Sequence, residues 1–174
     1  MIEIKQIKKQ NERDINIPNE KFTLFGRMIP SLSFSHWDYT IEKSETVCEM
    51  CFPDENYDFD EMSKDCVFLG AYDGDRCIGL AIMQNAPFKY MYLYDLKVNA
   101  RYRRRGVASK LIESAKKLAA DNGYRGIYAY CQDNNLGACM FYIKSGFRIG
   151  GFDTEVYNGT KQEGKSDIVF YLDR

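Results

Sequence analysis

Three arginines, a glycine and the beginning of an amphipathic segment follow one another directly after an apolar, β-rich run. The residues are Arg103, Arg104, Arg105, Gly106, Val107 and Ala108. Backbone N–H groups at the beginning of a helix have no partner inside the helix, and the helix dipole favours negative charge there. Gly106 would let the backbone approach a ligand closely, and the arginines would add charge-assisted hydrogen bonds. This stretch is predicted to bind phosphate, the alternative being a solvated cluster of arginines.

A second set of polar residues lies at 135–144, a segment with the length of a short helix. Asn135 stands where this helix would begin, and asparagine is a favoured N-cap residue. Tyr142 follows two turns later. Its ordinary pKa of about 10 leaves it protonated at pH 7, so that it could donate a proton. A tyrosine that only fills the core is the alternative.

The apolar run before the arginines, Tyr90 to Val98, is predicted to be a strand. Tyr94, Leu96 and Val98 would share one face of it, and Asp95 would point to the opposite face unless a bulge turns it. The segment from Glu42 to Asp65 is rich in acidic residues and includes Asp58 and Asp60. It would attract a cationic substrate, or it is a solvated loop that aids solubility.

Length, composition and net charge narrow the class of protein to which the chain can belong. The chain has 174 residues, 45% hydrophobic and 14% aromatic, which fits one globular domain spanning 1–174. A net charge of −1 gives no general attraction to nucleic acid or to an anionic membrane. The N-terminus lacks the apolar core of a signal peptide, and no run is long enough to span a bilayer. A cytoplasmic protein is the expectation.

The six cysteines are expected to be small buried residues rather than disulfides or ligands. Cys48 and Cys51 have zinc-ligand spacing, but no second such pair exists and His36 is the only histidine, so no metal is expected. Cys131 and Cys139 lack a neighbouring histidine that would activate a nucleophilic thiol.

The remaining pattern predicts the elements that position these residues. In the N-terminal part, a strand is expected at 2–7, a loop at 11–20, a pair of strands at 22–29 and 36–41, and a short helix from Glu42 that becomes a loop after Pro53. Asp73 and Gly74 signal a hairpin turn between strands at 67–72 and 77–83. Helical spacing covers 106–122 and 135–144, with further strands at 126–131, 147–157 and 167–172. Hairpins followed by strand–helix–strand–helix–strand predict an α/β fold of the mixed kind, a sheet flanked by helices.

Three elements then coincide at characteristic separations. They are Arg103-x-x-Gly106-x-Ala108, the strand Tyr94-Asp95-Leu96-Lys97-Val98 just before it, and Asn135-x-x-Ala138-x-x-x-Tyr142 followed by Lys144-x-Gly146-Phe147. Together they resemble the GNAT N-acetyltransferases over about Val67 to Asp173. This resemblance implies the GNAT fold, a central, mostly antiparallel twisted sheet with a parallel pair splayed at the cofactor site. It also implies an acetyl-CoA-binding core at 66–174, a substrate-side part at 1–65 and, as in many members of this fold, a homodimer.

The resemblance also implies roles for individual residues. Arg103 to Ala108 would hold the pyrophosphate of acetyl-CoA, and Leu96 and Val98 would offer backbone N–H groups to its pantetheine arm and thioester oxygen. Asn135 would contact coenzyme A, and Tyr142 would protonate the departing thiolate. The base is left open, because Tyr94 stands where many relatives have a glutamate. Tyr94, Asp95 and Asp153 are the candidates for a base or a substrate contact, and a water relay is the alternative.

A finer match favours one subgroup. The stretch from Asp133 to Tyr157, together with Gly26-x-x-Ile29-Pro30 and Trp37, resembles the streptothricin acetyltransferases. That implies acetylation of a cationic small-molecule amine, the β-lysine part of streptothricin, with Trp37, Asp58 and Asp60 on the substrate side. An acetyltransferase for polyamines, amino acids or protein amines is the second possibility, and a non-catalytic acyl-CoA sensor is the third.

Overall fold

The computed structural model describes residues 1–174, and the chain divides into two compact units. The first unit comprises Met1–Lys21, Cys51–Ile127 and Asp173–Arg174, and the second comprises Phe22–Met50 and Tyr128–Leu172. Both units are discontinuous in sequence, so each is assembled from segments that long-range packing brings together.

The first unit contains an antiparallel four-stranded arrangement in the order β1-β4-β5-β6. Its strands are β1 (Ile2–Gln6), β4 (Cys66–Asp73), β5 (Arg76–Gln84) and β6 (Tyr90–Val98). Its helices are η1 (Lys9–Asn16), α1 (Phe59–Met62), η2 (Ala100–Tyr102) and α2 (Val107–Asp121). Gly74, with φ of +61°, makes the tight turn between β4 and β5.

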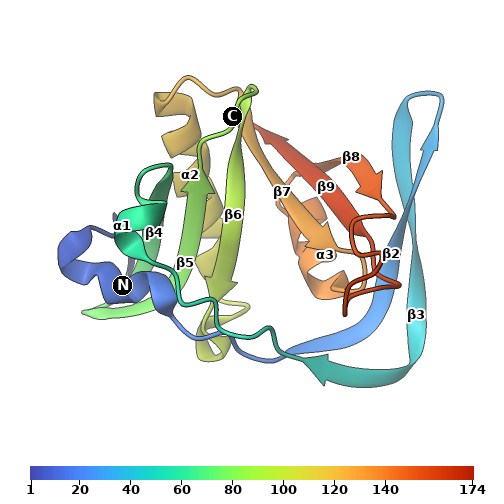
Figure 1. The fold of residues 1–174 in the computed structure, drawn as a ribbon, viewed down its shortest axis with the longest axis horizontal. Helices are drawn as coiled ribbons and strands as arrows, with labels where there is room; N and C mark the ends of the chain where they lie inside the picture. The colour runs from blue at the N-terminus through green and yellow to red at the C-terminus, as the bar shows by residue number, and fades with distance from the viewer. The chain divides into compact units, whose positions relative to one another are not determined.

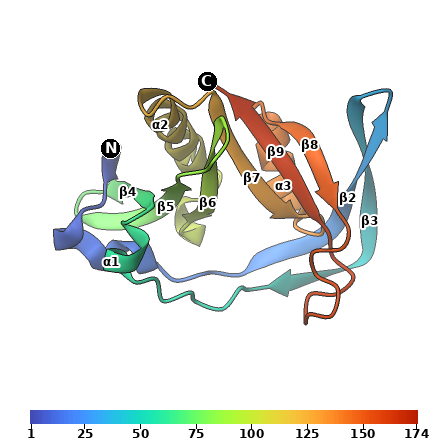
Figure 2. The ribbon, with the colours of Figure 1, turned by 45° about the horizontal axis from the view of Figure 1, so that its top comes forward.

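Helices cover both faces of these strands. Alternate residues of a strand point to opposite faces, so neighbours on β5 serve different layers. A side chain at Gly79 would meet Val107 and Leu111 of α2, whereas Leu80 belongs to a cluster with Ile15 of η1. In Figures 1 and 2, α2 accordingly lies behind the strands, with η1 and α1 in front of them. The core of this unit is thus two apolar layers, one on each side of the sheet.

The second unit contains a long hairpin, further strands and a helix, which Figure 1 shows in the blue-to-cyan and orange-to-red parts of the ribbon. The hairpin consists of β2 (Phe22–Ser33) and β3 (His36–Met50). The further strands are β7 (Gly126–Gln132), β8 (Arg148–Asp153) and β9 (Asp167–Asp173), in the order β7-β9-β8. The helix α3 (Leu136–Lys144) packs on β2, and β3 contacts β8.

Most of the predicted elements are confirmed, including a mixed α/β class with a mostly antiparallel sheet. The predicted strand at 90–98 coincides with β6, and both predicted helices lie within a residue of the observed ones. No helix is both long and apolar enough to cross a membrane.

Three predictions for the local structure are wrong. The segment from Glu42 is strand rather than helix, because β3 pairs with β2 at 36–43 and again at 48–50, on either side of an irregularity, and Phe22 lies opposite Met50. The first part of the loop expected at 11–20 belongs instead to a 3₁₀ segment at 9–16, kinked at Asn11, in which Ile15 is fully buried in the core. The strand expected at 147–157 ends at Asp153, where a turn begins.

Candidate functional site

The backbone of the 103–108 loop adopts the conformation that its glycine allows. Gly106 has φ of +79° and Arg104 has φ of +62°, and the helix α2 begins at the next residue, Val107. Gly106 is the N-cap, and no side chain caps the first turn of α2. The helix therefore begins without the hydrogen-bonding side chain that usually satisfies its first N–H groups, as an anion-binding helix N-terminus does.

The arginines of this loop differ in what they contact. Arg103 turns inward: its Nε donates to the carbonyl oxygen of Val98 over 3.2 Å, and its Nη1 donates to that of Lys21 over 2.7 Å. Arg105 is exposed and lies over the ring of Tyr102, 5.5 Å from its centre. The motif does not distinguish the three arginines. In the structure, only the guanidinium of Arg103 is described as hydrogen-bonded to β6, and it holds the loop against that strand.

A bulge in β6 decides where Asp95 points. Asp95 lies opposite Ile82 and Leu93 lies opposite Met83, so Tyr94 has no partner residue on β5. An extra residue of this kind shifts the alternation of the strand. Consequently Tyr94 and Asp95 reach the same neighbour, Tyr57. The ring centres of Tyr57 and Tyr94 are 6.0 Å apart, and the Tyr57 hydroxyl donates to Asp95 Oδ2 over 3.2 Å.

Asp95 is part of a largely buried charge network. Lys97 Nζ lies 3.2 Å from Asp95 Oδ2 and 2.9 Å from Glu55 Oε2, and its side chain is only 11% exposed. Burial raises the pKa of Asp95; Lys97 opposes that shift and the Glu55 charge adds to it. Burial also raises the pKa of Tyr57, which therefore keeps its proton. A carboxylate whose pKa is raised in this way is a better proton acceptor near pH 7.

Two asparagines fix the segment that carries Glu55 and Tyr57. The Asn16 side chain donates to the Tyr57 carbonyl oxygen over 2.8 Å and accepts from the Tyr57 N–H over 2.7 Å. Asn19 Nδ2 donates to Glu55 Oε1 and to the Pro53 carbonyl oxygen, each over 2.9 Å. The position of Tyr57 is thus set by hydrogen bonds from a part of the chain about 40 residues away.

A cavity of about 460 Å³ opens beside this network, and its lining is acidic and aromatic. Asp58, Glu61 and Asp65 contribute carboxylates, and Tyr57 and Tyr94 contribute rings. Asp58 is also the N-cap of α1, accepting from the Glu61 N–H over 2.9 Å. Such a cavity suits a ligand that carries positive charge.

Asp60, the second acidic residue singled out from the sequence, does not line this cavity. It pairs instead with Lys9, whose Nζ lies 2.7 Å from Asp60 Oδ2. Of the predicted substrate-side carboxylates, only Asp58 therefore lies at the acidic cavity.

In the second unit, Asn135 and Tyr142 occupy opposite ends of α3. Asn135 is the N-cap, and its Oδ1 accepts from the Ala138 N–H over 3.3 Å. Tyr142 is buried, with its ring stacked on Phe170 and edge-on to Phe147. These structural roles are compatible with additional contacts to a cofactor.

The two remaining predicted residues of the second unit lie in different surroundings. Asp153 accepts from the N–H groups of Glu155 and Val156, over 2.9 and 3.1 Å, and so forms a turn after β8. Trp37, at the beginning of β3, lines a separate cavity of about 400 Å³ together with Arg148 and Ile143.

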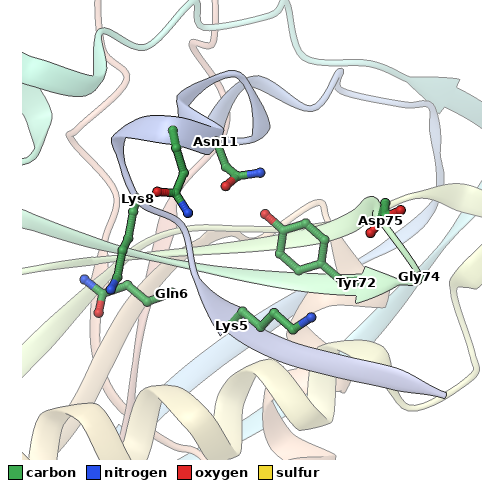
Figure 3. Close-up of a pocket in the computed structure, with 8 residues that line it drawn as sticks. Lys5, Gln6, Lys8, Asn11, Tyr72, Gly74 and Asp75 are labelled. Carbon is green, nitrogen blue, oxygen red and sulfur yellow. The ribbon is translucent and has the colours of Figure 1, made fainter.

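A further cavity, of about 500 Å³, lies between β1, η1 and the β4–β5 turn (Figure 3). Lys5, Lys8 and Asn11 surround the ring of Tyr72 there, and the Tyr72 hydroxyl donates to Asp14 over 2.6 Å. Lys5 is paired with Glu3 over 2.7 Å. None of the residues predicted for catalysis lines this cavity.

The cysteines are only partly as expected. All six are free; Cys66, Cys131 and Cys139 are buried, whereas Cys48 and Cys51 are exposed. The expectation that the cysteines are buried is wrong for Cys48, which lies on the exposed part of β3, and for Cys51, which follows that strand. No group of three or more histidine, cysteine or acidic side chains is arranged to hold a metal ion.

Comparison with known proteins identifies the family. The model of the acetyltransferase (GNAT) family matches residues 34–147, which is more than half of the chain. The chain belongs to the GNAT acetyltransferase family. The expected enzyme class, an N-acetyltransferase, is thereby confirmed.

The similarity to individual relatives covers nearly the whole of this chain. Streptothricin acetyltransferase A of Bacillus subtilis is 32% identical over 163 residues, which cover 92% of this chain and 94% of the relative. Among solved structures, a candidate streptothricin acetyltransferase of Bacillus anthracis in complex with acetyl coenzyme A has a TM-score of 0.90 at 28% identity, covering all of both chains. Nourseothricin acetyltransferase, at 18% identity and a TM-score of 0.82, shares the fold.

Sequence reasoning missed three residues of this acetyltransferase that the structure joins to Asp95, namely Glu55, Tyr57 and Lys97. A signal for Lys97 was present, because Asp95 and Lys97 are the only charged residues of the otherwise uncharged strand at 90–98. Nothing in the sequence pointed to Tyr57, which is 38 residues from its partner.

Proposed function

We propose that this acetyltransferase transfers the acetyl group of acetyl-CoA to an amine of streptothricin, on its β-lysine part, and so confers resistance to the antibiotic. The similarity to a streptothricin acetyltransferase over 92% of the chain supports this substrate. The observation that carries the proposal is the acidic cavity beside Tyr94 and Asp95, because a cationic substrate requires such a lining.

On the cofactor side, the first turn of α2 and the 103–108 loop would bind the pyrophosphate of acetyl-CoA. The left-handed conformation at Gly106 and the absence of a capping side chain support this role. Arg103 would hold the loop in place through its two carbonyl contacts, while Arg104 and Arg105 are exposed and can add positive charge. Binding of acetyl coenzyme A by the Bacillus anthracis protein supports the same cofactor here.

Further contacts to the cofactor would come from the backbone of β6 and from α3. Leu96 and Val98 would offer N–H groups to the pantetheine arm and to the thioester oxygen. Asn135 would contact coenzyme A in addition to capping α3. Tyr142 would donate its hydroxyl proton to the departing thiolate.

On the substrate side, Asp58, Glu61 and Asp65 would hold the cationic amine by charge. An alkyl ammonium with a pKa of about 10.4 leaves only about one molecule in a thousand neutral at pH 7. A proton acceptor is therefore needed, and Asp95 is the candidate that the bulge turns toward Tyr57. Acetylation would remove a positive charge that the antibiotic carries.

The test is thiol release by the purified protein with acetyl-CoA and a panel of amines: streptothricin, an aminoglycoside, spermidine, lysine and a peptide. We expect turnover with streptothricin at micromolar concentration, and mass spectrometry should show one added acetyl group on the β-lysine part. No release with streptothricin alongside turnover of another amine would contradict the proposed substrate while leaving the enzyme class intact. Absence of turnover with every amine would favour a sensor of acyl-CoA.

A further inference from the structure

Tyr57 stands between the acidic cavity and a buried carboxylate. The tyrosine lines the cavity, whereas Asp95 does not, and the Asp95 side chain is only 17% exposed. The Tyr57 hydroxyl connects the cavity with the carboxylate, because it donates a hydrogen bond to Asp95 Oδ2 over 3.2 Å. An amine bound in the cavity would therefore lie against Tyr57 and not against Asp95, which does not line it.

We propose that Tyr57 is the proton relay of this acetyltransferase, passing the proton of the bound ammonium to Asp95. This inference rests on the proposed function, since it requires an amine in the cavity. In the step, the Tyr57 oxygen accepts a proton from the ammonium nitrogen while its own hydroxyl proton moves to Asp95 Oδ2. The tyrosine ends neutral, as it began; the amine becomes neutral and the carboxylate becomes a carboxylic acid. The freed lone pair of nitrogen can then attack the thioester.

The groups around Asp95 favour this direction of transfer. Three charged or titratable side chains face Asp95. Lys97 comes from β6, and Glu55 and Tyr57 come from the segment between β3 and α1. Burial raises the pKa of Asp95, which makes it a better acceptor, while the Lys97 charge opposes that shift. Burial raises the pKa of Tyr57, so the hydroxyl passes a proton on without ionising.

Tyr57 is also held more firmly than a ring that only fills space. Asn16 brackets its backbone with two hydrogen bonds, and Lys97 Nζ lies 5.7 Å from the centre of its ring. A 3.2 Å hydrogen bond is long for two oxygens, but such contacts in unliganded sites shorten when substrate binds.

The relay is tested with Tyr57→Phe and Asp95→Asn, both compared with Tyr72→Phe. Tyr72 is a matched control, because its hydroxyl also donates to an aspartate, Asp14, but at a cavity that no predicted catalytic residue lines. For each variant, kcat/KM for the amine is measured from pH 6 to pH 9 with saturating acetyl-CoA. The acceptor is whichever amine of the panel the unaltered protein acetylates.

If the relay operates, the ammonium form of the amine is a substrate, so the rate does not depend on the fraction of amine that is neutral in solution. For the unaltered protein and for Tyr72→Phe, kcat/KM should therefore stay constant across this pH range. Without the relay, only the neutral amine reacts, and kcat/KM of Tyr57→Phe and Asp95→Asn should rise about tenfold per pH unit. At pH 7 we expect both to be about 10²-fold below the unaltered protein. A profile of Tyr57→Phe that runs parallel to that of the unaltered protein would overturn the relay. Rejection of streptothricin alone would instead count against the proposed substrate.

Discussion

The Lys97 ammonium lies 3.2 Å from the Asp95 carboxylate, two residues away on the same strand, and 2.9 Å from Glu55. One buried cation thus compensates two carboxylates that come from different parts of the chain. This arrangement contributes to the stability of the site, and the Lys97 charge opposes the rise that burial produces in the pKa of Asp95.

Replacing that cation should be costly. In Lys97→Met, the two carboxylates face each other without compensation, which we expect to lower the free energy of unfolding by about 3 kcal/mol. The pKa of Asp95 should rise further, moving the acid limb of the kcat/KM profile to higher pH. Lys64→Met is the control, because its pair with Glu61 is exposed on both sides and should contribute less than about 1 kcal/mol. Equal losses in urea unfolding would contradict this account.

Asp95 should also make stability depend on pH. Its pKa is raised in the folded state, so the stability it contributes is full below the unfolded pKa of about 3.9 and is lost as pH rises through the folded pKa. In Asp95→Asn the side chain no longer titrates, so this decrease in stability with rising pH is absent. We therefore expect its unfolding free energy, relative to that of the unaltered protein, to increase between pH 4 and pH 7, although activity falls. A relative stability that stays constant with pH would refute the prediction.

Replacing Gly106 should weaken binding of acetyl-CoA in addition to lowering the stability of the fold. Gly106→Ala places a side chain at φ of +79°, which costs about 1–2 kcal/mol although nothing lies within 4 Å of the new methyl group. The displaced loop should raise KM for acetyl-CoA. Gly123→Ala is a matched control at the other end of α2, with φ of +80° and equally open surroundings. Its melting temperature should fall similarly while its KM stays unchanged.

Neutralising the acidic cavity should weaken binding of the amine. Asp58→Asn combined with Glu61→Gln keeps an N-cap residue on α1 and removes two negative charges from the lining. We expect KM for the amine to rise about tenfold with KM for acetyl-CoA unchanged. Asp60→Asn should leave both values as they are, because Asp60 pairs with Lys9 outside the cavity. A similar rise in Asp60→Asn would show a general charge effect.

Tyr142→Phe tests the proposed acid. The ring packing against Phe147 and Phe170 is kept, and only the hydroxyl is removed. We expect kcat to fall about 10²-fold, with little change in KM for acetyl-CoA, because the proton is needed only as the thiolate leaves. An unchanged kcat would remove Tyr142 from the mechanism.

The sequence alone indicated those features that rest on local chemistry. The turn at Asp73 and Gly74, the strand at 90–98 and the cap of α3 at Asn135 follow from residue types a few positions apart, since turn geometry, strand alternation and capping are local properties. The motif Arg103-x-x-Gly106-x-Ala108 also needs only a glycine before a helix. The family could be recognised without a structure because this motif coincides with Asn135, Tyr142 and the Gly146-Phe147 pair at the family's separations.

Tertiary structure decided which side chains act together. The bulge at Tyr94 turns Asp95 toward Tyr57, and Asn16, 41 residues from Tyr57 in sequence, fixes that tyrosine in place. Long-range strand pairing likewise overrode the helical tendency after Glu42, and ion pairing with Lys9 took Asp60 away from the cavity. The physical reason is that these contacts join residues far apart in the chain. No periodicity or short motif encodes them, and only burial and hydrogen bonding in the folded protein select them.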